Sequence, residues 1–157
     1  LGKALGGASG GFVAGRKEIV EYLRQRSRPY LFSNTLAPGI AGASVRALEI
    51  VAQDADRRRR PLVSAERFRH GISQAGFDLL PSKTAIQAVM VYDEPTAVTT
   101  AEKLLDEGIY VIGFAYPVVP RGKARIRVQL SAAHTDDEID AAIQAFIRVG
   151  REMNVVG

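Results

Sequence analysis

Residues 113–135 read GFAYPVVPRGKARIRVQLSAAHT, and their pattern decides the fold class of this chain. Two prolines and the turn residues 121–123 separate two extended runs. In the run at residues 124–131, every second side chain is apolar, as in a β-strand with one buried face. The apolar positions are Ile126, Val128 and Leu130, and the polar positions are Arg125, Arg127 and Gln129. We therefore expect a half-buried strand with two arginines on its open face.

The flanking segments extend this strand into a mixed unit. Residues 85–92 (AIQAVMVY) and 109–114 predict two further strands, and residues 95–107 predict a helix between them. Residues 135–138 (TDDE) have the spacing of a capping box, which predicts a final helix that runs to about Met153. Strands interleaved with helices are typical of the α/β class.

The first half of the chain has a mostly helical pattern. We expect a short buried strand at residues 12–14 and an extended run at residues 30–34. Helices are expected at residues 16–27, from Pro38 onward and from about residue 61 to residue 76. Pro38 marks a helix start because proline at the first helical position loses no hydrogen bond.

Composition excludes several classes of site. The chain has 157 residues, of which 46% are hydrophobic and 24% charged, and this balance is ordinary for a globular domain. It has no cysteine, so it has no disulfide framework and no thiolate metal site. Its apolar runs are far shorter than the ~20 residues that cross a bilayer. We expect neither a metal site nor a membrane partner.

Basic residues gather in two runs, residues 24–28 (RQRSR) and 57–60 (RRRR), although the net charge is only +4. A basic run is one signal of nucleic-acid binding. The second run follows Asp54 and Asp56 and contains no aromatic residue for base stacking. We therefore expect solvated helix ends and no nucleic-acid partner. A basic nucleic-acid-binding module, with salt-sensitive affinity for DNA or RNA, is the weaker alternative.

One lysine stands among small residues in the stretch at residues 1–11 (LGKALGGASGG). Lys3 precedes the glycines, so the order is not that of a phosphate-binding loop. Small neighbours let a bulky cofactor approach the amine, which suits a Schiff-base role for Lys3. On the residues alone, a tight turn with an exposed lysine is the plainer interpretation.

Three motifs together resemble one enzyme family. They are the stretch at residues 1–11, residues 24–38 (RQRSRPYLFSNTLAP) and residues 113–135. All three are similar to the pyridoxal-phosphate-dependent α-oxoamine synthases, and the resemblance runs over the whole chain. It implies an α/β protein with the PLP-dependent transferase fold type I, which is aspartate-aminotransferase-like.

The resemblance also implies a domain organisation. These enzymes are much longer, and the chain resembles their C-terminal part. Residues 1–34 correspond to the end of the large cofactor domain, residues 35–60 to a connecting helix, and residues 61–157 to the small C-terminal α/β domain. Because other cofactor contacts of the family lie upstream, this part alone is expected to be inactive.

Site residues are carried over from the family one by one. Lys3 matches the lysine that binds pyridoxal 5'-phosphate covalently and then removes the substrate Cα proton. Ser33 and Asn34 match residues that contact the cofactor phosphate of the neighbouring subunit, which implies a homodimer with shared active sites. Arg127 matches the arginine that binds the substrate carboxylate, and Arg125 is expected to be structural.

Within the family, the resemblance is closest to members that join glycine and acetyl-CoA. The implied reaction is the reversible conversion of these substrates to 2-amino-3-oxobutanoate and CoA, in threonine degradation. A sister synthase that uses another acyl-CoA is the alternative. The implied location is the cytoplasm, or the mitochondrion in a eukaryote.

Overall fold

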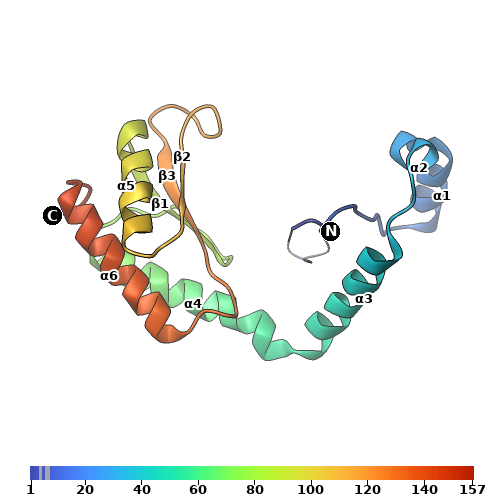
Figure 1. Ribbon diagram of the computed structural model, residues 1–157, viewed down its shortest axis with the longest axis horizontal. Helices are drawn as coiled ribbons and strands as arrows, with labels where there is room; N and C mark the ends of the chain where they lie inside the picture. The colour runs from blue at the N-terminus through green and yellow to red at the C-terminus, as the bar shows by residue number, and fades with distance from the viewer. Residues whose placement is uncertain (4, 6–7) are drawn as a thin grey trace. The chain divides into compact units, whose positions relative to one another are not determined.

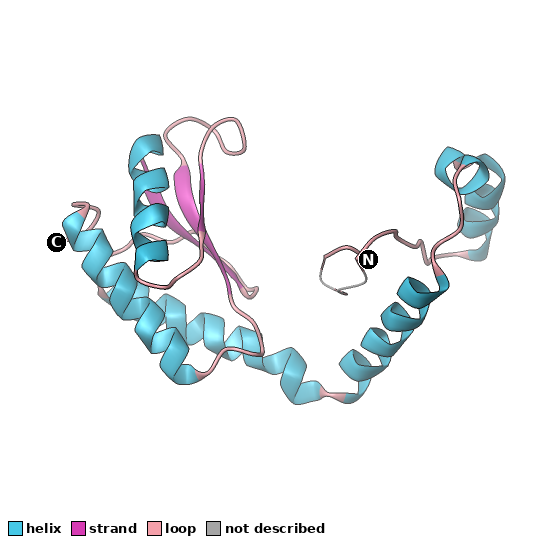
Figure 2. Ribbon diagram, in the orientation of Figure 1, coloured by secondary structure: helices cyan, strands magenta, loops and turns pink. Residues whose placement is uncertain are grey.

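The computed structural model describes residues 1–157 except residues 4, 6 and 7. Its residues divide into two compact units, residues 1–55 and 56–157, and each unit is described by itself (Figures 1 and 2). In chain order the elements are α1 (Lys17–Arg26), α2 (Arg28–Phe32), α3 (Pro38–Gln53), α4 (Ala55–Gln74), β1 (Ile86–Tyr92), α5 (Glu94–Asp106), β2 (Ile112–Phe114), β3 (Ala124–Gln129) and α6 (Asp136–Glu152). The three domains expected from the sequence stay a prediction.

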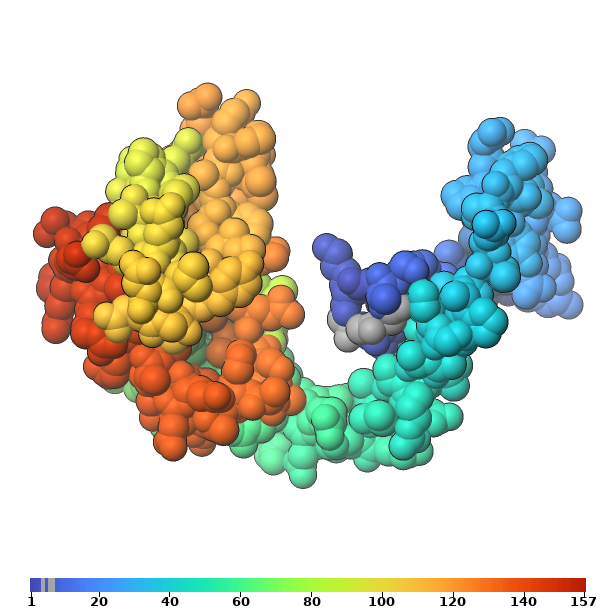
Figure 3. Space-filling view, in the orientation of Figure 1, coloured from blue at the N-terminus to red at the C-terminus, as the bar shows by residue number. Residues whose placement is uncertain are grey.

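The second unit is an antiparallel sheet covered by helices on one side. The strand order is β1-β3-β2, so the strand predicted from the alternating pattern is the central one. Helices α4, α5 and α6 lie together on one side of the sheet (Figures 1 and 2), and Figure 3 shows α5 (yellow) and α6 (red) as adjoining surfaces. The strands β1 and β3, helix α5 and helix α6 predicted from the sequence are confirmed, with ends that differ by one or two residues.

The core fills the space between the sheet and these helices. Alternate residues of β3 are buried, which confirms the predicted half-buried strand. The two rings Phe68 and Phe77 both meet Phe146 edge-on, with centroids 5.5 and 6.2 Å away. Such pairs add to the free energy that apolar burial supplies. The largest buried apolar side chains are Phe68, Phe146, Ile72, Leu104, Ile126, Ile139 and Val89.

Gly113 determines which way strand β2 faces. A Cβ atom at this position would lie 2.7 Å from the carbonyl oxygen of Ala97 in α5, so the helix packs directly on the strand backbone. Position 113 therefore faces the helices. Because successive residues of a strand point to opposite faces, Ile112 and Phe114 lie on the face away from α5.

Local and long-range polar contacts fix the start of α6. The Thr135 hydroxyl accepts a hydrogen bond from the Glu138 N–H at 3.2 Å, and the Glu138 carboxylate accepts one from the Thr135 N–H at 2.8 Å. This confirms the predicted capping box. Arg67 of α4 holds Asp140 of α6 through both carboxylate oxygens. The two helices are thereby joined at the surface of the second unit.

Helix α4 begins earlier than expected, at Ala55, so the predicted start at residue 61 is wrong. Pro61 lies inside the helix, where it removes one backbone donor. Two ion pairs lie just before it: Arg59 pairs with Asp56 at 3.2 Å, and Arg60 pairs at 3.1 Å with Asp136 at the start of α6. The contact with α6 joins residues far apart in the chain, so the local sequence pattern could not predict it.

Two other expectations for local structure are wrong. Residues 12–14 form no strand and are exposed, since the described part of the first unit contains no strand that could pair with them. Residues 30–34 are not an extended run, because α2 occupies Arg28–Phe32. Pro29 stands in the first turn of α2, where its missing N–H is no loss, and the Ser27 carbonyl accepts from the Leu31 N–H at 3.0 Å. Strand β2 is also shorter than predicted and begins at Ile112.

Candidate functional site

Arg127 lies on the open face of the sheet, at its central strand. It pairs in register with Ala88 of β1 on one side and with Ile112 of β2 on the other. Its side chain is exposed, whereas its neighbours in the strand, Ile126 and Val128, are buried in the core. The structure therefore confirms that Arg127 lies on the open face of the strand, as the alternating pattern predicted.

The guanidinium of Arg127 stacks on an aromatic ring. Its central carbon lies 4.4 Å from the ring centroid of Phe114, which is a cation–π contact. Phe114 is the diagonal neighbour of Arg127, because it pairs directly with Arg125. Within the described residues, no carboxylate forms an ion pair with Arg127. The five N–H donors of this guanidinium thus remain available to a ligand with two acceptor oxygens.

Arg125, two residues away on the same face, is held differently. It is half-buried, and its Nε–H donates to the carbonyl oxygen of Lys123 at 3.1 Å. Its partner in β1 is Met90, which is buried. The local hydrogen bond agrees with the structural role expected for Arg125.

Lys3, Ser33 and Asn34 belong to the first unit. The side chains of all three are exposed. Ser33 ends α2, and its hydroxyl donates to the carbonyl oxygen of Pro29. Asn34 follows in the segment that leads to α3, whose N-cap is Ala37. The structure shows these three side chains to be exposed, and within the part of the chain that it describes no hydrogen bond joins any two of them; their roles as cofactor-binding residues stay a prediction.

The comparable basic groups elsewhere are engaged in structural contacts. In the run at residues 57–60, Arg59 and Arg60 pair with Asp56 and Asp136. In the run at residues 24–28, the last turn of α1 carries Arg24 and Arg26, as expected for cations at a helix C-terminus. Neither run contains an aromatic residue, and Arg28, the last residue of the first run, lies over the ring of Phe32 with 5.2 Å to the centroid.

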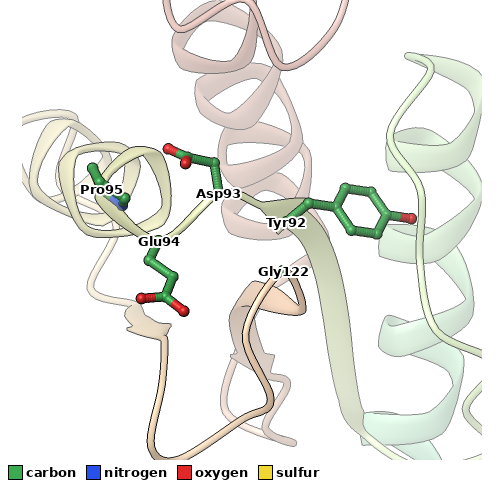
Figure 4. Close-up of a pocket in the computed structure, with 5 residues that line it drawn as sticks. All are labelled: Tyr92, Asp93, Glu94, Pro95 and Gly122. Carbon is green, nitrogen blue, oxygen red and sulfur yellow. The ribbon is translucent and has the colours of Figure 1, made fainter.

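A shallow pocket of about 440 Å³ lies where β1 meets α5 and the turn at Gly122 (Figure 4). Asp93 caps α5: its carboxylate accepts from the Thr96 hydroxyl at 2.6 Å and from the Thr96 N–H at 3.0 Å, and these bonds lower its pKa. Tyr92 points away from the carboxylates of Asp93 and Glu94 in Figure 4. Its hydroxyl donates to Asp78, a bond that raises the pKa of the phenol. The polar groups therefore diverge and are committed to the fold.

Two further observations concern the residues that the structure describes. They contain no group of three or more histidine, cysteine, aspartate or glutamate side chains placed to hold a metal ion. No described helix is long and apolar enough to cross a membrane.

Sequence reasoning identified Arg127 but missed Phe114, the residue on which it stacks. The alternation of β3 places Arg127 on the open face, and that signal is local. Phe114 is brought to the same face by the register of β2 with β3. Gly113 was the available clue, because a glycine inside a short strand marks a close backbone approach on its own side and so places Phe114 on the other.

Comparisons with known proteins agree on one family. The model of the class I and II aminotransferases matches residues 1–146. The 2-amino-3-ketobutyrate coenzyme A ligase of Salmonella typhimurium is 56% identical over 156 residues, which are 99% of this chain and 39% of that protein. The 8-amino-7-oxononanoate synthase of Symbiobacterium thermophilum is 42% identical over 156 residues, 99% of this chain and 40% of that protein. The chain thus spans about two-fifths of the length of these curated relatives.

A solved structure is also similar to this chain over nearly its whole length. A high-resolution structure of SPT with a PLP internal aldimine superposes with a TM-score of 0.89 at 29% identity. The superposition covers 96% of this chain and 38% of that one. The matched residues thus extend across both units of the chain.

Proposed function

We propose that this chain, which belongs to the class I and II aminotransferase family, is part of a pyridoxal-phosphate-dependent acyltransferase that joins glycine to acetyl-CoA. The products are 2-amino-3-oxobutanoate and CoA, and the reaction is reversible. The fold is the α/β fold type I of PLP-dependent transferases, as the sequence predicted. The observation that carries the proposal is the 56% identity to a 2-amino-3-ketobutyrate coenzyme A ligase over 99% of the chain.

Arg127 binds the glycine carboxylate in this proposal. Its guanidinium is exposed on the open face of the sheet, and its donors are free of ion pairs among the described residues. A planar fork of N–H groups holds both oxygens of a carboxylate, so it fixes the direction of the adjacent Cα–H bond. Orientation of that bond is what proton removal requires.

Lys3, Ser33 and Asn34 hold the cofactor. The primary amine of Lys3 would hold the aldehyde of pyridoxal 5'-phosphate. The Asn34 carboxamide would donate to its phosphate oxygens, and the Ser33 hydroxyl would do so on exchanging its present acceptor, the Pro29 carbonyl, for the phosphate. When bound, the cofactor supplies a sink for the electron pair left at Cα. The freed Lys3 amine takes the proton from Cα as a general base. These assignments of Lys3, Ser33 and Asn34 rest on the family motifs and on the exposure of the three side chains.

The carboxylate assignment is tested by two matched substitutions in the complete protein. Arg127→Lys replaces a two-point fork by a single ammonium, and charged hydrogen bonds contribute about 1.5–3 kcal/mol. We expect kcat/KM for glycine to fall by roughly ten- to a hundred-fold. Arg125→Lys is the control, because Arg125 has a local backbone partner, and its kinetics should stay within about twofold of wild type. Equal effects of the two substitutions would remove Arg127 from the carboxylate site.

The cofactor assignment and the dimer are tested together. Lys3→Ala should abolish the visible absorbance of covalently bound cofactor and nearly all turnover. We also propose a homodimer in which Ser33 and Asn34 of one subunit contact the phosphate held by the other. Mixing Lys3→Ala subunits with Ser33→Ala/Asn34→Ala subunits should then restore activity, since one site of the hybrid has both partners intact. Hybrids that form without regaining activity would contradict shared sites.

A sister synthase with another acyl donor is the second candidate, because an 8-amino-7-oxononanoate synthase is 42% identical over 99% of the chain. The two candidates share the proposed roles of Lys3 and Arg127, and one difference between them is the acyl-CoA that they use. Steady-state rates of the complete protein with acetyl-CoA and with longer acyl-CoA thioesters distinguish them. We expect the highest kcat/KM with acetyl-CoA.

A further inference from the structure

The ring of Phe114 lies under the guanidinium of Arg127, with 4.4 Å between the guanidinium carbon and the ring centroid. We infer that Phe114 is a positioning residue, which sets the plane of the Arg127 guanidinium for a two-point grip on the substrate carboxylate. This inference rests on the proposed role of Arg127 and adds to it a specific residue that determines how well the carboxylate is held.

A ring under a guanidinium can restrain it without using its N–H donors. The N–H groups of arginine lie in the plane of the fork and point outward from its edge. A carboxylate partner would occupy that edge, whereas an aromatic ring contacts only the flat face. Phe114 therefore restrains Arg127 while leaving both parallel N–H bonds for an incoming carboxylate.

The ring that does the positioning is itself anchored. Phe114 belongs to β2, which is paired to β3 in a fixed register that sets Ile112 opposite Arg127 and Phe114 opposite Arg125. On its other face, β2 packs against α5 at Gly113 with no room for a Cβ atom. The backbone of β2 is thus fixed both along the sheet and across it, and this fixes the point from which the Phe114 ring extends.

A second arginine–aromatic pair in the same unit has the same separation but is not held by a sheet. The Arg121 guanidinium lies 4.4 Å from the ring centroid of Tyr116, the same separation as for Arg127 and Phe114. Both residues are exposed in the irregular segment between β2 and β3. This pair is a matched control, since it has the same chemistry and separation but no strand register or helix packing to hold it.

If Phe114 restrains Arg127, the protein should bind a carboxylate more tightly than it would without the ring. A long, flexible side chain loses rotamer freedom when a ligand orders it, and prior restraint removes part of that loss. We expect Phe114→Leu, which keeps an apolar side chain but removes the flat ring, to weaken glycine binding by about three- to tenfold. Phe114→Tyr keeps the ring face and should bind glycine as wild type does.

The experiment measures dissociation constants of the complete, cofactor-loaded protein from the change in its visible absorbance on amino-acid binding, in the absence of acyl-CoA. Glycine is compared with glycinamide, which has the same amine but no carboxylate. Phe114→Leu should weaken glycine alone, and Tyr116→Leu should weaken neither ligand. Equal weakening of glycine and glycinamide by Phe114→Leu, or no effect on either, would overturn the positioning role.

The same titration separates this inference from the proposed function. Arg127→Gln should lose most of the preference for glycine over glycinamide. If Arg127→Gln does so while Phe114→Leu behaves as wild type, then the positioning role is wrong and the carboxylate role of Arg127 stands. If Arg127→Gln leaves glycine binding unchanged, the carboxylate role itself is wrong, and the inference falls with it.

Discussion

Substitution of Gly113 by alanine should weaken the packing of helix α5 on strand β2. The added Cβ atom would meet the backbone of α5, at 2.7 Å from the Ala97 carbonyl oxygen and 3.0 Å from its carbonyl carbon. Neither atom can rotate away, so the strand or the helix must shift. Forcing extra volume into a packed interior costs about 1–3 kcal/mol.

Part of this cost is offset in the unfolded state. Glycine loses more conformational freedom on folding than alanine, by roughly 0.5–1 kcal/mol. The net effect of Gly113→Ala should therefore be a loss of about 1–2 kcal/mol from the free energy of opening α5 and β2. In native-state hydrogen exchange, this predicts about five- to thirtyfold faster exchange of amides in these two elements.

Gly71→Ala supplies the control. Its Cβ atom would lie nearest to side-chain atoms of Ile143 rather than to backbone, at 2.8 Å from Cδ1, 3.0 Å from Cγ2 and 3.3 Å from Cγ1, and the change also gains about 1 kcal/mol of helix propensity in α4. We expect exchange within about threefold of wild type. Mass spectrometry of peptides from α5 and β2 reports both variants. Exchange rates in Gly113→Ala that equal those in Gly71→Ala would refute the argument that backbone contact, rather than added volume, decides the cost.

Two further predictions concern stability. Thr135→Ala removes the capping-box acceptor for the Glu138 N–H, so the free energy of unfolding in urea should fall by about 1 kcal/mol, whereas Thr135→Ser should retain it. Hydrogen bonds lower the pKa of Glu138 (from the Thr135 backbone), Asp140 (from Arg67) and Glu107 (from Arg148). The unfolded chain then takes up protons at higher pH than the folded one, so urea titrations should show stability constant above about pH 5 and falling as the pH drops through about 4. Stability that rises on acidification in this range would contradict the ion-pair assignments.

The parts of the fold that could be predicted from sequence are those with local causes. Helix α6 starts where Thr135 and Glu138 satisfy each other's backbone donors, and both residues are visible within four positions of sequence. The alternation of β3 likewise revealed its buried face. In contrast, the start of α4 at Ala55 was missed: Pro61 resembles a helix-start signal, and Arg60 pairs with Asp136, which is far away in the chain. Such a contact leaves no periodic signal.

The candidate site also has features that the local sequence shows and a contact that it does not show. Lys3 and Arg127 are assigned to the site by the resemblance of their motifs to a known family, and their roles stay predictions. The residues alone favour an exposed lysine in a tight turn and show only that Arg127 lies on the open face of its strand. The stacking of Phe114 under Arg127 depends on the pairing register of two strands, and a shift of one residue would send Phe114 to the helix side. The contact of Phe114 with Arg127 could not be predicted because the register of β2 with β3 was unknown, although Gly113 indicated which side of β2 faces the helices.

Register also explains why two arginines on one face have different environments. Arg125 stands between Phe114 of β2 and Met90 of β1, two large side chains, and its guanidinium turns back to the Lys123 carbonyl. Arg127 has Ala88 as its β1 partner, and a methyl group is too short to cover a guanidinium. The small residue leaves the open face accessible beside Arg127, and the diagonal ring supports the guanidinium from β2. The different environments of the two arginines thus arise from the cross-strand neighbours, since residue type and strand face are the same for both, and these environments favour the roles proposed for Arg125 and Arg127.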